Sequence, residues 1–100
     1  MFSVVPLPAD IVRDIAFQLR AEVQDSLVVI GSVYEGKPML TAAAADSLVE
    51  RGINVGQAIR QAAKLIQGGG GGQPHFATAG GKDAQALTSA VEQLIQLLTE

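Results

Sequence analysis

Five consecutive glycines, Gly68 to Gly72, constrain the fold of this 100-residue chain more than any other feature. Glycine lacks a Cβ, so its backbone reaches unusual conformations and allows a close approach by a ligand or a neighbouring segment. Ordering each glycine costs on the order of 1–2 kcal/mol of backbone entropy. Linkers usually mix glycine with serine over longer stretches, whereas here a second block of small residues, Ala77 to Gly81, follows almost at once. We therefore interpret residues 68–72 as an ordered glycine loop.

Length and composition limit what else the chain can be. One hundred residues make one domain, 1–100, and 48% apolar with 17% charged residues is typical of a globular fold. The absence of cysteine excludes a disulfide framework and a thiolate site, and with a single histidine we expect no metal site and no catalytic residue. A net charge of −3 argues against a generic polyanion binder but allows a local basic patch.

No segment predicts a membrane location. The longest uninterrupted aliphatic run, Leu27 to Ile30, is far shorter than the ~20 apolar residues that a bilayer requires. The first residues also lack the basic region of a signal peptide. We expect a cytoplasmic protein with no membrane partner. We also interpret the chain as a fragment of a larger protein, and this interpretation does not depend on whether Met1 is the natural start.

The apolar pattern predicts strands and helices in alternation. We expect an edge strand at 2–5, a helix at 9–24, a strand at 27–34 that is buried on both faces, a second strand at 38–43, a short turn at 47–51, a helix at 55–67, a short strand after the glycines and a last helix from residue 83. This order predicts an α/β fold: a small mixed β-sheet with helices packed on it.

Three polar residues mark where helices begin. Asp46 is predicted to cap the short turn, Asn54 to cap the next helix with Gln57 completing a capping box, and Asp83 to cap the last helix. The last helix carries an apolar stripe suited to core packing or self-association: Ala84, Leu87, Val91, Leu94 and Leu98.

The glycines fit neither of the common nucleotide-binding motifs. A phosphate-binding Walker loop needs Ser or Thr after Gly-Lys, but Asp83 follows Gly81-Lys82. A dinucleotide fingerprint follows a strand, whereas these glycines follow a helix.

The segment from Gly68 to Asp83 resembles the glycine-rich signature of the C-terminal, DHH-associated domain of alanyl-tRNA synthetase. The match continues upstream in order and spacing and covers roughly residues 9 to 98. The chain departs from the signature at Gln73, where Lys or Arg is common, at His75, where Asp is usual, and at Thr78, where Gln is usual. DHH-type phosphoesterases place a histidine directly after a glycine triplet, so the displaced His75 fits the synthetase branch better.

The resemblance implies a DHH-associated-domain-like fold that contacts tRNA without catalysing a reaction. In that family the domain docks the outer corner of tRNA, where the D-loop and T-loop meet, and supports aminoacylation and editing by upstream domains. The parent would be an alanine-tRNA ligase that uses ATP, Mg and Zn, with none of these cofactors bound in this domain. Two alternatives stay open: the nucleic-acid-binding lobe of a DHH-type phosphoesterase, and a dimerisation module that forms a homodimer.

Basic residues near the glycines are the candidate phosphate contacts. Arg60 and Lys64 lie one helical turn apart, where like charges cost about 0.2–0.5 kcal/mol that an anion would relieve, although both also suit a solvated helix end. Lys82 precedes a helix start, although Asp83 would already take the free N–H groups. We predict a nucleic-acid-binding set of Arg60, Lys64, Gly68, Gly69, Gly70, Gly71, Gly72, Gln73, His75, Gly80, Gly81 and Lys82.

Aromatic side chains are the candidate base contacts, because stacking of a base on an aromatic ring is worth about 1–3 kcal/mol. His75, Phe76 and Tyr34 are available. We expect Phe76 in the core and Tyr34, beside the Glu35-Gly36 turn, on the surface.

Overall fold

The computed structural model describes residues 2–5, 7–22 and 24–99. Its elements, in chain order, are β1 (Phe2–Val5), α1 (Ala9–Glu22), β2 (Leu27–Tyr34), β3 (Lys37–Ala44), α2 (Asp46–Glu50), α3 (Val55–Ala62), the 3₁₀ segment η1 (Ala63–Ile66), β4 (Gly69–Gln73), β5 (Phe76–Gly80), the 3₁₀ segment η2 (Ala84–Ala86) and α4 (Leu87–Thr99).

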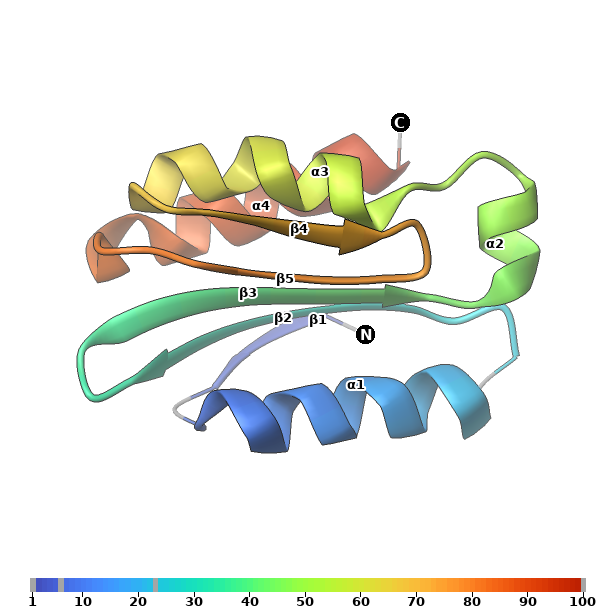
Figure 1. The fold of residues 1–100 in the computed structure, drawn as a ribbon, viewed down its shortest axis with the longest axis horizontal. Helices are drawn as coiled ribbons and strands as arrows, with labels where there is room; N and C mark the ends of the chain where they lie inside the picture. The colour runs from blue at the N-terminus through green and yellow to red at the C-terminus, as the bar shows by residue number, and fades with distance from the viewer. Residues whose placement is uncertain (1, 6, 23, 100) are drawn as a thin grey trace.

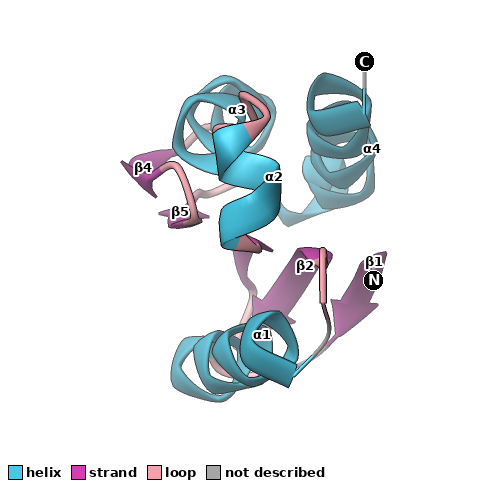
Figure 2. Cartoon of the chain, turned by 90° about the vertical axis from the view of Figure 1, so that its right-hand side faces the viewer, coloured by secondary structure: helices cyan, strands magenta, loops and turns pink. Residues whose placement is uncertain are grey.

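The strands form one five-stranded sheet in the order β1-β2-β3-β5-β4. β1 runs parallel to β2, and every other neighbouring pair is antiparallel. Helix α1 covers one face of the sheet, and α3 and α4 cover the other (Figure 1 and Figure 2). The predicted α/β class, with helices on a small mixed sheet, is confirmed.

The core has two parts because β2 is buried on both faces. Val28 and Ile30 pack beneath α1, whereas Val29 belongs to the larger cluster beneath α3 and α4. This division is what an unbroken apolar run predicts for a strand between two layers. The stripe of α4 joins the larger cluster, since Leu87, Val91, Leu94 and Leu98 are all buried.

Two of the three predicted caps are present. Asn54 accepts a hydrogen bond from the Gln57 backbone N–H at 3.1 Å, and Asp83 accepts one from the Ala86 backbone N–H at 3.3 Å. The predicted cap at Asp46 is wrong, because the cap position of α2 is Ala45 and Asp46 is already helical. The Asp46 carboxylate instead pairs with the Arg20 guanidinium of α1.

The helix predicted at 55–67 changes its geometry before it ends. The α-helix stops at Ala62, and 3₁₀ turns continue to Ile66. Gln67 then takes a left-handed conformation, with φ of 54°. Its neighbour Gly68 donates a backbone hydrogen bond to the Ala63 carbonyl at 3.0 Å, so the chain turns sharply from helix into strand.

The glycine run is a strand rather than the expected loop. Gly69–Gln73 forms β4, which pairs with β5 through the two-residue turn Pro74-His75. The turn is held by two backbone hydrogen bonds, from Ala44 N–H to the His75 carbonyl at 2.9 Å and from Val55 N–H to the Pro74 carbonyl at 3.1 Å. The glycines are ordered by strand pairing, which sequence periodicity does not reveal when side chains are absent.

Close backbone packing explains why β4 consists of glycine. A Cβ on Gly72 would lie 2.6 Å from the Phe76 carbonyl oxygen, and a Cβ on Gly70 would collide with the Thr78 carbonyl oxygen. Helix α3 approaches from the other side, since a Cβ on Gly56 would lie 2.8 Å from the Gly72 carbonyl oxygen. By contrast, a Cβ on Gly69 would meet nothing within 4 Å.

We expect Gly56→Ala to lower the free energy of unfolding by about 1–3 kcal/mol, because the new methyl group overpacks the contact between α3 and β4. Helix propensity alone predicts the opposite sign. Gly69→Ala is the matched control and should stay within about 0.5 kcal/mol of the parent. Urea denaturation measures both values, and an unchanged or stabilised Gly56→Ala would contradict the packing.

Candidate nucleic-acid interface

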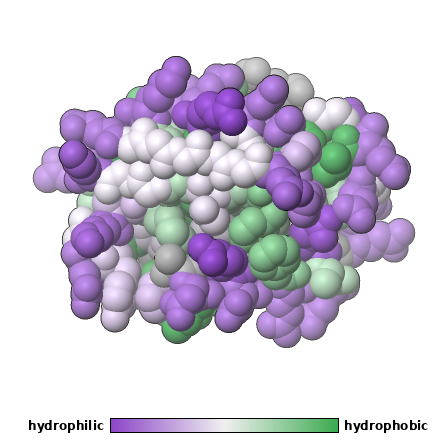
Figure 3. All heavy atoms as spheres, in the orientation of Figure 1, coloured by the Kyte–Doolittle hydropathy of each residue, from purple (hydrophilic) through white to green (hydrophobic). Residues whose placement is uncertain are grey.

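Strand β4 is an exposed edge made almost entirely of backbone. It lies at the end of the sheet, and Gly69, Gly70 and Gly72 are exposed. An edge strand turns alternate N–H and C=O groups away from its partner. This edge faces the viewer in Figure 1, and the matching view in Figure 3 shows a pale band there with apolar side chains below it. A ligand can therefore reach main-chain donors that side chains usually cover.

Arg60 brings a positive charge to this edge. Its Nη2 and Nε atoms lie 3.5 and 3.6 Å from the position that a Cβ on Gly71 would take. Gly71 has a φ of 149°, which disfavours other residues. Lys64, one turn further along, is also exposed. The predicted grouping of Arg60 with the glycines is therefore present in space.

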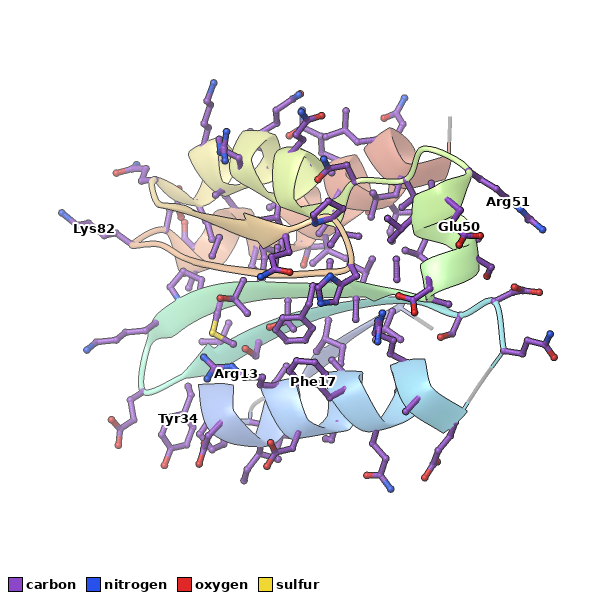
Figure 4. All side chains as sticks on the ribbon, turned by 45° about the vertical axis from the view of Figure 1, so that its right-hand side comes forward. Arg13, Phe17, Tyr34, Glu50, Arg51 and Lys82 are labelled. Atoms are coloured by element: carbon purple, nitrogen blue, oxygen red, sulfur yellow. The ribbon has the colours of Figure 1, made fainter. Side chains whose placement is uncertain are left out.

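A hollow of about 270 Å³ lies on the α1 side of the β4–β5 hairpin. Its walls include Gly71, Gln73 and His75 from the predicted set. They also include Arg13 and Phe17 of α1, which lie near one another in Figure 4. The Phe17 ring stacks on Phe76 with 4.2 Å between ring centroids and 8° between planes. Positive charge and aromatic surface meet here.

Sequence reasoning missed Arg13 and Phe17. Phe17 is 45% exposed, whereas Val12 and Ala16 form the buried face of α1. The available signal in the sequence was a large aromatic residue four positions after an arginine on the predicted helix. Phe76, expected in the core, is half-buried: it packs against the core cluster beneath α1, and its ring stacks on Phe17.

The remaining predicted residues lie at the other end of the hairpin. Gly68, Gly80, Gly81 and Lys82 line a second, larger cavity together with Lys37, which sequence reasoning also missed. The backbone N–H groups of Lys82 and Asp83 both donate to the Ile66 carbonyl, at 2.7 and 2.9 Å. These amides are therefore occupied, and Lys82 offers its side chain rather than a helix-terminus anion pocket.

The described residues hold no cluster of three His, Asp or Glu side chains suited to a metal ion. Within the same residues, no helix has the length and apolar character needed to span a membrane.

The fold and the edge define a small α/β domain that ends its sheet in a bare glycine strand. Residues 3–100 match the model of the DHHA1 domain, and the chain belongs to that family. The predicted resemblance to the DHH-associated domain is confirmed.

Curated relatives place the chain more narrowly. It is 56% identical over 93 residues to an alanine-tRNA ligase of Bacteroides thetaiotaomicron, and the aligned region covers 92% of this chain and 11% of that protein. It is 47% identical over 91 residues to the alanine-tRNA ligase of Porphyromonas gingivalis, and the aligned region covers 89% of this chain and 10% of that protein. The chain thus spans about a tenth of the length of these relatives.

Solved structures agree. The C-Ala domain of Aquifex aeolicus alanyl-tRNA synthetase superposes with a TM-score of 0.84 at 25% identity, covering 99% of this chain and 89% of that one. A DHH-domain protein described as a member of the s1p family of ribosomal proteins gives a TM-score of 0.61 at 13% identity, covering 95% of this chain and 23% of that one, which shows a shared fold. The chain is a homologue of the C-terminal domain of alanyl-tRNA synthetase.

Substitution of Asp83 tests whether its carboxylate stabilises the start of the last helix by accepting a hydrogen bond from the Ala86 N–H. We expect Asp83→Ala to lower the free energy of unfolding by about 1 kcal/mol, because the Ala86 N–H loses its side-chain acceptor and keeps only the Asp83 backbone carbonyl, at 3.3 Å. Asp83→Asn keeps an acceptor oxygen and should lose much less. Urea denaturation compares the two variants, and equal losses would show that the side-chain acceptor does not stabilise the helix start.

Proposed function

We propose that this domain binds tRNA as the C-terminal part of an alanyl-tRNA synthetase and docks the outer corner, where the D-loop and T-loop meet. The supporting observation is the bare β4 edge with the Arg60 guanidinium beside it. The similarity to alanine-tRNA ligases favours this role over the phosphoesterase lobe.

Phosphate contact is the chemistry that suits this edge. A phosphate can approach a glycine backbone closely enough for its oxygens to accept hydrogen bonds from the backbone N–H groups. An adjacent arginine adds charge-assisted hydrogen bonds. Arg60 comes from α3 and Arg13 from α1, so cations lie on both sides of the hairpin. Such a surface reads the shape and backbone of RNA rather than its sequence.

The overall charge limits affinity. With a net charge of −3, the isolated domain has few cations to spare, and we propose two or three phosphate contacts. Each contact contributes about 0.7 to 0.9 to the slope of log K against log salt, so the salt dependence is shallow. Tight binding relies on the upstream domains of the same chain.

The proposal also covers the rest of the protein. Upstream domains would activate alanine with ATP and Mg²⁺ and hold Zn²⁺, while this domain needs no cofactor. The parent ligase would work in the cytoplasm. Self-association into a homodimer stays a prediction, although the apolar stripe of the terminal helix α4 is buried in the core and does not supply its surface.

Two labelled RNAs test the docking surface. We expect the 100-residue chain to bind a minimal folded D-loop/T-loop corner more tightly than an acceptor-stem hairpin, as measured by fluorescence anisotropy. Equal binding to both RNAs, or binding to neither, would contradict the proposal.

Arg60 tests the edge directly. We expect Arg60→Gln to weaken binding to the corner RNA and to reduce the salt slope by about 1. Arg51→Gln removes the same charge from an exposed residue that lies on α2's side of the molecule, opposite Lys82 (Figure 4), and should leave the slope unchanged. If Arg60→Gln and Arg51→Gln gave the same salt slope, the RNA would not be bound at the β4 edge.

A further inference from the structure

The larger cavity is a second site that phosphate contact at β4 does not use. It has a volume of about 480 Å³, within the usual range for small-ligand pockets. It opens where the β2–β3 turn meets the start of β4 and the end of β5. Its lining residues are Leu7, Ser32, Tyr34, Lys37, Pro38, Met39, Gln67, Gly68, Gly80, Gly81 and Lys82.

The walls of this cavity suit a flat ring. Tyr34 is 47% exposed, so much of its surface is free to contact a ligand. Met39 supplies a polarizable apolar surface. Ser32, only 2% exposed, and Gln67 add neutral polar side chains to the lining. Gly80 leaves room, since a Cβ there would meet nothing within 4 Å.

The cavity also carries two positive charges. Lys37 begins β3 and Lys82 follows β5, and both are exposed. Among the described residues, the salt bridge is that of Arg20 with Asp46. Neither Lys37 nor Lys82 is therefore paired with a described carboxylate. No Asp or Glu lines the cavity. An apolar slot flanked by unpaired cations complements a planar group that carries anionic neighbours.

The cavity continues the surface already described. Thr78 lines the smaller hollow and Gly80 lines the larger one, two residues further along β5. Residues i and i+2 of a strand share one face of the sheet and lie about 7 Å apart. The two hollows therefore open on the same face of the hairpin, so one RNA strand that passes over this face can reach both sites.

We propose that this cavity receives the base of one unpaired nucleotide of the bound RNA, stacked against Tyr34, with its flanking phosphates on Lys37 and Lys82. The inference rests on the proposed tRNA-binding function and adds a base-binding pocket to it. An unpaired base is the part of RNA that can leave its stack and enter a pocket.

The chain reports on this pocket by its own fluorescence, because Tyr34 is its single tyrosine and it has no tryptophan. We expect the corner RNA to quench the tyrosine emission when it binds. Corner RNAs made abasic at one unpaired loop position at a time should include one that binds without quenching.

Variants separate the ring from the charges. Tyr34→Phe keeps a ring for stacking and should bind the corner RNA within about twofold of the parent, whereas Tyr34→Leu should bind roughly tenfold more weakly. Lys37→Gln and Lys82→Gln should each lower the salt slope by about 1, and Arg51→Gln, outside both hollows, is the control. Gly80→Val fills the cavity without a charge change and should abolish quenching, with its melting temperature checked in parallel.

The outcomes distinguish the two proposals. RNA binding without tyrosine quenching, or equal affinities for Tyr34→Phe and Tyr34→Leu, overturns the base pocket and leaves the β4 docking edge in place. Absence of binding by every variant and by the parent overturns both proposals.

Discussion

The contact between helix α3 and the backbone of β4 determines how the glycine half of the domain is built. Gly56 faces the Gly72 carbonyl so closely that a methyl group at Gly56 would have to displace main chain. On its other side β4 lies against β5, where Cβ atoms on Gly70 and Gly72 would strike carbonyl oxygens. At Gly70 and Gly72 the strand therefore has no volume for a side chain, and the entropy cost of ordering glycine is offset by paired backbone groups.

That packing also decides what reaches solvent. Because α3 lies against β4, the Arg60 side chain extends along the strand to Gly71 and carries its charge to the open edge. The same helix passes through 3₁₀ turns to Ile66, whose carbonyl accepts hydrogen bonds from both Lys82 and Asp83. Both ends of the hairpin are therefore tied to the α3–η1 segment by backbone hydrogen bonds, which need no side chains on the strand.

The sheet gives the molecule two unlike faces. Helices α3 and α4 cover one face completely enough to bury the larger core cluster. On the other face α1 covers β2 and β3 and meets the hairpin through the stack of Phe17 on Phe76, which leaves the two hollows beside Phe17 and Tyr34. Cations border both hollows although the chain is acidic overall. The proposed RNA contact therefore rests on the local arrangement of these cations and not on the net charge.

Local sequence was sufficient for features that depend on near neighbours. The double burial of β2 follows from its apolar run, and the caps at Asn54 and Asp83 act over three residues. The signature from Gly68 to Asp83 was enough to identify the family. Only the tertiary structure decided that the glycines form an edge strand, that Asp46 pairs with Arg20, and that Arg13 and Lys37 join the predicted residues. Each of these depends on contacts between segments distant in sequence, and a residue without a side chain, or a lone exposed cation, carries no periodic pattern that would predict its neighbours.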